Sequence, residues 1–147
     1  MKKLLLIFIV VIAVYGFAQK APKLFSIGTS FGSEISTSDL SIEKAFKNNQ
    51  SNIQVGGSGK VVKILPDDIK GSRHQKFIIE LNSGQTLLIA HNIDIAPRIG
   101  TLNVGDHINF YGEYEWNSKG GVVHWTHHDP SGRHEGGWLN HGGKIYQ

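Results

Sequence analysis

The sequence contains no cysteine among its 147 residues. Disulfide bonds, thiolate metal sites, cysteine nucleophiles and a lipid-modified N-terminal cysteine are therefore excluded. The zinc-protease signature H-E-x-x-H is also missing, as are internal repeats and low-complexity blocks. What remains is 39% hydrophobic and 18% charged residues in a chain of single-domain length, a composition typical of a globular protein.

A long apolar run occurs at the N-terminus. Lys2 and Lys3 precede an unbroken apolar stretch over residues 4–15, which small residues follow at positions 16 and 18. This stretch is shorter than the ~20 apolar residues that a membrane-spanning helix needs. We therefore predict that residues 1–18 are a secretory signal peptide, that the protein is exported to a periplasmic or extracellular location, and that no membrane span remains after cleavage.

The excess of positive charge lies near the N-terminus. The whole chain has a formal charge of +3, but residues 52–147 contain nine Lys and Arg against nine Asp and Glu. All eight histidines lie between His74 and His141, so this region becomes positive as the pH falls through about 6.5. A neutral domain lacks the cationic surface on which strong nucleic-acid affinity depends. The expected partner is therefore a small ligand or an oligomer.

Hydrophobic periodicity divides the rest of the chain. Residues 19–38 read as a linker or arm, and 39–147 as one domain. Apolar residues at helical spacing predict a short helix over 39–49, capped by Ser38 or Asp39. Alternating patterns and turn residues then predict five strands, over 54–65, 75–81, 85–91, 107–116 and 121–128.

The arrangement of these strands indicates the fold class. A long connection precedes the fourth strand, and glycines at bend positions interrupt the first and fourth. This pattern favours a mostly β fold: a five-stranded OB-like antiparallel barrel over about 53–128, with a short N-terminal helix and an irregular, His-rich tail over 129–147. Another small antiparallel barrel or sandwich is the alternative.

Hairpin register predicts a pairing on the outer face of the barrel. If the fourth and fifth strands share a core-facing set and a four-residue turn, Glu113 lies opposite His124 and Tyr111 opposite Thr126. Glu115 then lies next to the first pair. A carboxylate beside an imidazole can orient a metal ligand or raise the pKa of the histidine for acid–base work.

Histidines and carboxylates cluster near the C-terminus, where five of the eight histidines fall within residues 124–141. Imidazole with carboxylate suits a divalent ion such as Zn, Fe or Mn. A set of capping and hydrogen-bonding side chains is the structural alternative. The candidate metal ligands are His124, His128, Asp129 and Glu113, and the candidate catalytic residues are Arg73, His74 and His134.

Other polar and aromatic residues can serve either to bind a ligand or to stabilise the fold. Arg73 can hold an anion, or it can pair with Asp67 or Asp68 in its own loop. Arg98 can likewise pair with Asp94. Most aromatic residues alternate towards the core, which leaves few for ligand contact. The candidate binding residues are Tyr111, Glu113 and Trp138.

Several motifs together resemble a family of small exported bacterial proteins of unknown function. The resemblance covers about residues 45–147. It implies export and one small domain, but neither an activity nor a cofactor. The motifs that carry it are Gly57-Ser58-Gly59, Gly71-Ser72-Arg73-His74-Gln75, His91-Asn92-Ile93-Asp94, Gly112-Glu113-Tyr114-Glu115-Trp116-Asn117 and His124-Trp125-Thr126-His127-His128-Asp129-Pro130.

Three functional hypotheses follow from the sequence. The first is an exported OB-like binding module for an oligosaccharide, a peptide or a nucleic-acid fragment. The second is a metal-dependent, phosphodiesterase-like hydrolase in which Arg73 holds the anionic substrate and His134 or His74 moves the proton. The third is a pH-responsive interaction protein in which the histidine cluster is the switch.

Overall fold

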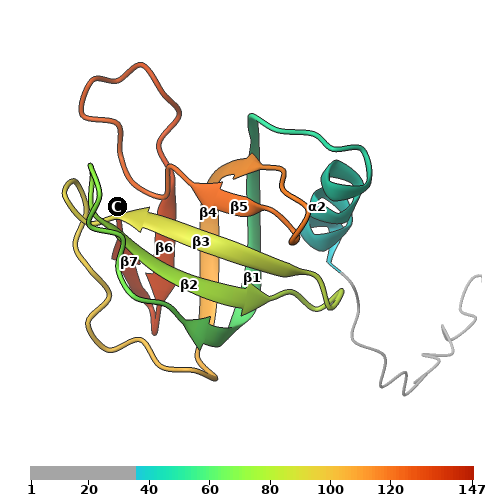
Figure 1. The fold of residues 1–147 in the computed structure, drawn as a ribbon, viewed down its shortest axis with the longest axis horizontal. Helices are drawn as coiled ribbons and strands as arrows, with labels where there is room; N and C mark the ends of the chain where they lie inside the picture. Colours follow the sequence, from blue (N-terminus) through green and yellow to red (C-terminus); the bar gives the residue numbers. More distant parts are fainter. Residues whose placement is uncertain (1–35) are drawn as a thin grey trace, which may run out of the picture. The chain divides into compact units, whose positions relative to one another are not determined.

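The computed structural model describes residues 36–147, so the predicted signal peptide and most of the predicted arm lie outside the described residues. One helix is followed by seven strands (Figure 1). No helix in the described range is long and apolar enough to cross a membrane. The elements are α2 (Thr37–Lys47), β1 (Ile53–Ile64), β2 (His74–Glu80), β3 (Thr86–Asn92), β4 (His107–Glu115), β5 (Val122–His124), β6 (Trp138–His141) and β7 (Lys144–Tyr146).

Five of the strands close into a barrel in the order β1-β2-β3-β5-β4, because β1 pairs with both β2 and β4. The predicted OB-like barrel is thus confirmed. The expectation that it is entirely antiparallel is wrong for one pair, since β3 and β5 run parallel. A closed ring with an odd number of strands cannot alternate direction at every step, so one parallel pair is a geometric necessity.

The core consists of the inward-facing side chains of these strands. In β2, β3 and β4 every second residue is buried, which is the period of a half-buried strand. Burying a large apolar side chain contributes roughly 1.5–3 kcal/mol relative to leaving it exposed. The buried core includes Val55, Val61, Phe77, Ile79, Leu87, Ile89, Ile108, Phe110, Tyr114 and Val123.

Helix α2 packs on the barrel through its apolar side. Its N-cap is Ser36, whose hydroxyl accepts a hydrogen bond from the backbone N–H of Asp39 at 3.1 Å, so the helix starts earlier than predicted. Ile42 is fully buried. Trp116, in contrast, does not join the core: it is 37% exposed, and its ring stacks on Phe46 at 6.4 Å.

The chain after β5 differs from the prediction. β5 ends at His124 rather than continuing to residue 128, because Trp125 adopts a positive φ of 52° that takes the backbone out of the extended conformation. The tail predicted to be irregular contains the hairpin β6–β7, which extends the sheet beyond β4. Tyr111 consequently pairs with Trp138, and the predicted pairing with Thr126 is wrong.

Candidate functional site

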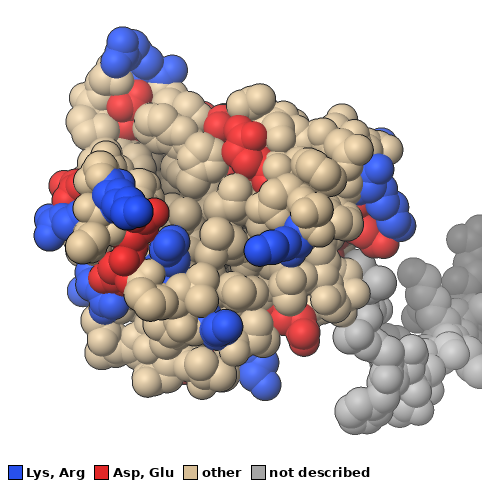
Figure 2. All heavy atoms as spheres, in the orientation of Figure 1, with Lys and Arg blue, Asp and Glu red and all other residues tan. Residues whose placement is uncertain are grey.

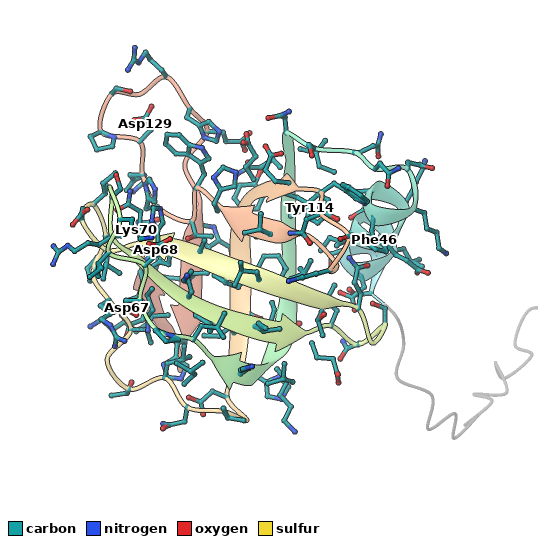
Figure 3. All side chains as sticks on the ribbon, in the orientation of Figure 1. Phe46, Asp67, Asp68, Lys70, Tyr114 and Asp129 are labelled. Atoms are coloured by element: carbon teal, nitrogen blue, oxygen red, sulfur yellow. The ribbon has the colours of Figure 1, made fainter. Side chains whose placement is uncertain are left out.

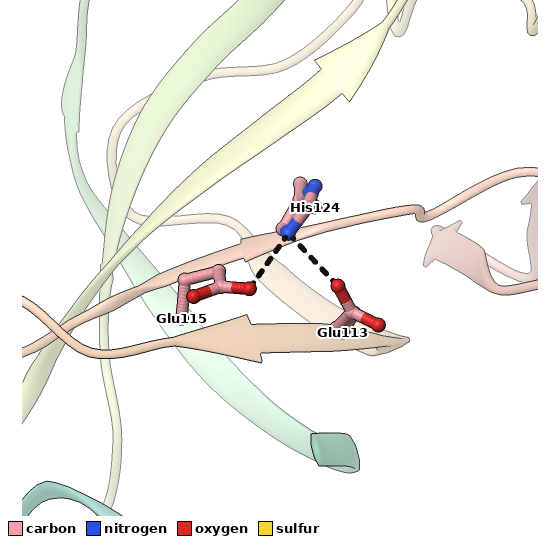
Figure 4. A group of neighbouring side chains, drawn as sticks. All are labelled: Glu113, Glu115 and His124. Atoms are coloured by element: carbon pink, nitrogen blue, oxygen red, sulfur yellow. Dashed lines mark ion pairs between the residues drawn. The ribbon is translucent and has the colours of Figure 1, made fainter. Parts of the chain in front are cut away.

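Two glutamates of β4 and one histidine of β5 converge on the outer face of the barrel (Figure 4). Nε2 of His124 lies 3.4 Å from Oε1 of Glu113 and 3.9 Å from Oε1 of Glu115. The register places Glu113 opposite His124, which confirms the predicted pairing. We call Glu113, Glu115 and His124 the carboxylate–imidazole cluster.

A glycine allows the two strands of this cluster to approach closely. Gly112 lies between the outward-facing positions of β4, and a Cβ there would collide with the carbonyl oxygen of His124 and with the side chain of Thr126. The absence of a side chain lets the end of β5 pack directly against β4. The close approach brings the imidazole of His124 over the two carboxylates.

The imidazole of His124 has a nitrogen that makes no hydrogen bond within the described residues. Its Nε2 is buried and has no hydrogen-bond partner among residues 36–147. Burial lowers the pKa of His124, although the charges of Glu113 and Glu115 act in the opposite direction. The neutral ring is therefore favoured at neutral pH, and a neutral imidazole nitrogen is a metal ligand.

His134 supports the cluster from the loop between β5 and β6. Its Nε2 donates to Oε2 of Glu113 at 2.8 Å, and its Nδ1 donates to the carbonyl oxygen of Glu135 at 2.7 Å. Burial opposes the charged ring, but these hydrogen bonds and the charge of Glu113 outweigh it and raise the pKa of His134. The ring also stacks on Trp125 at 3.9 Å. His134 thus holds Glu113 in place.

Asp129 and His128, two predicted metal ligands, lie in the same loop but are not brought into the cluster. Asp129, labelled in Figure 3, accepts hydrogen bonds from the backbone N–H groups of Ser131, Arg133 and His134. The hydroxyl of Ser131 also donates to it, and these bonds lower the pKa of Asp129 well below its ordinary value. His128 is exposed. In this arrangement Asp129 shapes the loop that carries His134.

Arg73, a candidate for holding an anion, is already engaged by a carboxylate. Its backbone N–H and its Nε donate to Asp94 at 2.7 and 2.6 Å, and these two bonds lower the pKa of Asp94. Arg98 instead pairs with Asp67 at 3.1 Å. The two predicted ion pairs are thus exchanged, because the loop before β2 lies beside the end of β3.

Tyr111 and Trp138, the predicted binding aromatics, contact each other across β4 and β6. Their rings stack with centroids 6.3 Å apart, and the hydroxyl of Tyr111 donates to Glu135 at 2.6 Å. Glu113, the third predicted binding residue, belongs to the carboxylate–imidazole cluster. The two aromatic rings therefore contact each other, and the hydroxyl of Tyr111 is bonded to Glu135.

A groove runs over the outer faces of β2, β3 and β5. It comprises three adjoining hollows of about 190, 460 and 220 Å³ that share lining residues. The candidate catalytic residue His74 and the cluster residues Glu115 and His124 lie in its wall. Figure 2 shows acidic and basic side chains interspersed on the visible face rather than gathered in one basic area. We call this feature the β2–β3–β5 groove.

Comparison with known proteins gives one assignment. No curated protein matches the chain. A family model described as "Protein of unknown function (DUF3465)" matches residues 25–147. The chain belongs to the DUF3465 family. The predicted membership of an uncharacterised family is confirmed, and the match begins about twenty residues earlier than the predicted resemblance.

The sequence did not direct attention to the groove floor of this DUF3465 protein. Its floor is formed by outward-facing apolar residues of three strands, among them Ile78, Leu88, Ala90 and Val122. The available signal was that strands β2 and β3 are apolar on both faces, as in the runs at 77–79 and 87–90. A barrel strand that faces water on one side alternates apolar with polar residues instead.

Proposed function

We propose that this DUF3465 protein is an exported binding module that holds an extended peptide in the β2–β3–β5 groove. The observation that carries the proposal is the apolar floor on the outside of a barrel whose core is already complete. Ile78, Leu88 and Val122 face outward and line hollows of about 220 and 460 Å³. Apolar side chains in a concave surface favour a ligand that covers them.

The chemistry of the floor favours a peptide over the other ligand classes. Its apolar members are aliphatic, whereas single-stranded nucleic acids bind by stacking their bases on aromatic rings in a positive groove. Trp125 at one end of the groove stacks on His134. An extended peptide presents alternate side chains to such a surface, which aliphatic pockets can accept.

Charged groups at the groove wall suit a peptide as well. Lys76 and Asp68 lie 3.9 Å apart at one side, and Glu115 lines the same hollow. Both signs of charge therefore line the same hollow, where they can contact charged side chains or the termini of a peptide. The predicted signal peptide adds the expectation that the ligand is met outside the cytoplasm.

Chemical-shift mapping tests this proposal. The ¹⁵N-labelled protein is titrated with a hexapeptide of alternating leucine and serine, with a glycine–serine hexapeptide as the control ligand. Chitohexaose and decathymidylate represent the other ligand classes. We expect saturable shifts of the amides of Ile78, Leu88 and Val122 with the leucine peptide alone.

A matched pair of variants locates the binding. Leu88→Arg places a long cation in the groove, and Asn109→Arg places the same side chain on an exposed outward position of β4. Binding should be lost in the first variant and retained in the second. Saturable binding of the sugar or the oligonucleotide without binding of the peptide would overturn the proposal, as would peptide shifts that map away from the groove.

A further inference from the structure

The two distances from His124 to the carboxylates exceed those of ordinary hydrogen bonds and suit ligands that share a metal ion. One ligand atom from each of Glu113, Glu115 and His124 lies within 4.8 Å of the others. An N–H···O bond spans about 2.7–3.2 Å, whereas His124 Nε2 lies 3.4 and 3.9 Å from the two carboxylate oxygens. Metal–ligand bonds of about 2.0–2.1 Å in a tetrahedral site place neighbouring ligand atoms about 3.3 Å apart.

The cluster also has an imbalance that a cation would correct. Two carboxylates of β4 face a ring nitrogen that is buried and has no hydrogen-bond partner among residues 36–147. His134 contacts Oε2 of Glu113, whereas Oε1 is the oxygen nearer to His124. An unpaired buried polar atom is costly unless a ligand satisfies it.

We infer that Glu113, Glu115 and His124 bind one divalent transition-metal ion. One imidazole with two carboxylates is a ligand set for zinc, manganese or iron. Three protein ligands leave a coordination position for water or a ligand atom. Since Glu115 and His124 line the β2–β3–β5 groove, the ion would lie in the groove wall.

His134 acts as a positioning residue for this site. It donates to the oxygen of Glu113 that does not face His124, and its own second nitrogen is fixed by the Glu135 carbonyl. Hydrogen bonds of this kind orient metal-binding carboxylates, and their loss typically weakens metal affinity by about 10–100-fold. Asp129 contributes indirectly, since it accepts from the backbone N–H of His134.

The chain offers a matched control. His141 Nε2 and Asp106 Oδ2 also pair an imidazole with a carboxylate, but at 2.8 Å, which is a direct hydrogen bond. The two facing atoms are bonded to each other, and the pair does not belong to a group of three converging ligands among the described residues. It should therefore bind no metal.

Calorimetric titration and native mass spectrometry of the untagged full chain with Zn²⁺ and Mn²⁺ test the inference. We expect one ion per chain with micromolar or tighter affinity for at least one of the two metals. Glu115→Gln preserves side-chain shape and His124→Gln replaces the ring by an uncharged polar side chain. Each should weaken binding more than the about 10–100-fold expected for His134→Gln. His141→Gln should bind like the wild type.

Long-range ¹H–¹⁵N spectra of the histidine rings supply a readout that needs no variant. The bound ion should shift Nε2 of His124 and leave the ring of His141 unchanged. Absence of binding, or binding that shifts another histidine instead, would overturn the inference even if a variant fails to fold. These measurements contain no peptide, so they are decided separately from the proposed function.

Discussion

Two histidines on neighbouring strands differ in the direction of their side chains and in their hydrogen bonding. His91 of β3 points into the barrel and is fully buried. Its Nε2 donates to the carbonyl oxygen of Pro97 at 3.2 Å, and its Nδ1 accepts from the hydroxyl of Thr126 at 2.9 Å. His124 of β5 points outward, and its Nε2 is buried without a partner among residues 36–147.

The contrast separates polar groups that are bonded within the protein from polar groups that are free to bind a ligand. Gln75 is satisfied in the same way as His91, because its side chain both donates to and accepts from the backbone of Ile99, at 3.0 and 2.9 Å. The outward cluster leaves ligand atoms unpaired at the wall of a groove. In His124 the unpartnered nitrogen coincides with two converging carboxylates, and this combination distinguishes it from the other histidines.

The largest expected effect is that of removing the satisfied imidazole. His91→Ala leaves a cavity and strips Thr126 and the Pro97 carbonyl of their partner, so we expect a loss of about 3–4 kcal/mol of unfolding free energy. Urea denaturation of the wild type and the variant measures it. A loss below about 1 kcal/mol would mean that His91 is not a structural residue, and the contrast with His124 would fail.

The pH dependence of stability tests the same group. Burial lowers the pKa of His91 to about 4 from the ordinary 6.5. As the pH falls from 6.5 to 4, His91 becomes protonated in the unfolded chain but stays neutral in the folded chain. This difference lowers the free energy of unfolding by up to about 3 kcal/mol over that window.

The neutral variant His91→Gln isolates this contribution, because it retains every other titrating group. We expect its unfolding free energy to fall less steeply between pH 6.5 and pH 4 than that of the wild type. Equal slopes in the two proteins would show that burial does not keep the ring of His91 neutral in the folded state.

The smallest expected effect is that of removing the unsatisfied imidazole. In the absence of metal, His124→Ala breaks no hydrogen bond of Nε2, so we expect a change in unfolding free energy within about 1 kcal/mol. Urea denaturation in the presence of a chelator measures it. A loss as large as that of His91→Ala would assign His124 a structural role and remove the distinction between the two rings.

The site was predictable where it depended on strand period and turn length. The alternation in β4 and a four-residue turn were enough to place Glu113 opposite His124. The role of Asp129 was also within reach, because its partners Ser131 and Arg133 follow within four residues, as in other Asp-centred turns.

Other features depended on contacts between distant segments. The exchange of the Arg73 and Arg98 partners joins positions 21 and 31 residues apart. The end of β5 at Trp125 permits the following chain to turn back, and Gly137 lies where a Cβ would meet the carbonyl oxygens of Tyr111 and Trp125. Such close approaches are decided by packing, and no local pattern in the sequence encodes them.

The sequence by itself determined the class of fold, because the two-residue period of its apolar side chains defines strands and an odd closed set of them defines a barrel. It also determined the neutral charge of the domain and the lack of thiol chemistry. The tertiary structure alone decided which imidazoles have partners. Hydrogen bonding joins side chains across strands and loops, as between His91 and Thr126, 35 residues apart, so the same residue type is structural in one place and free to bind in another.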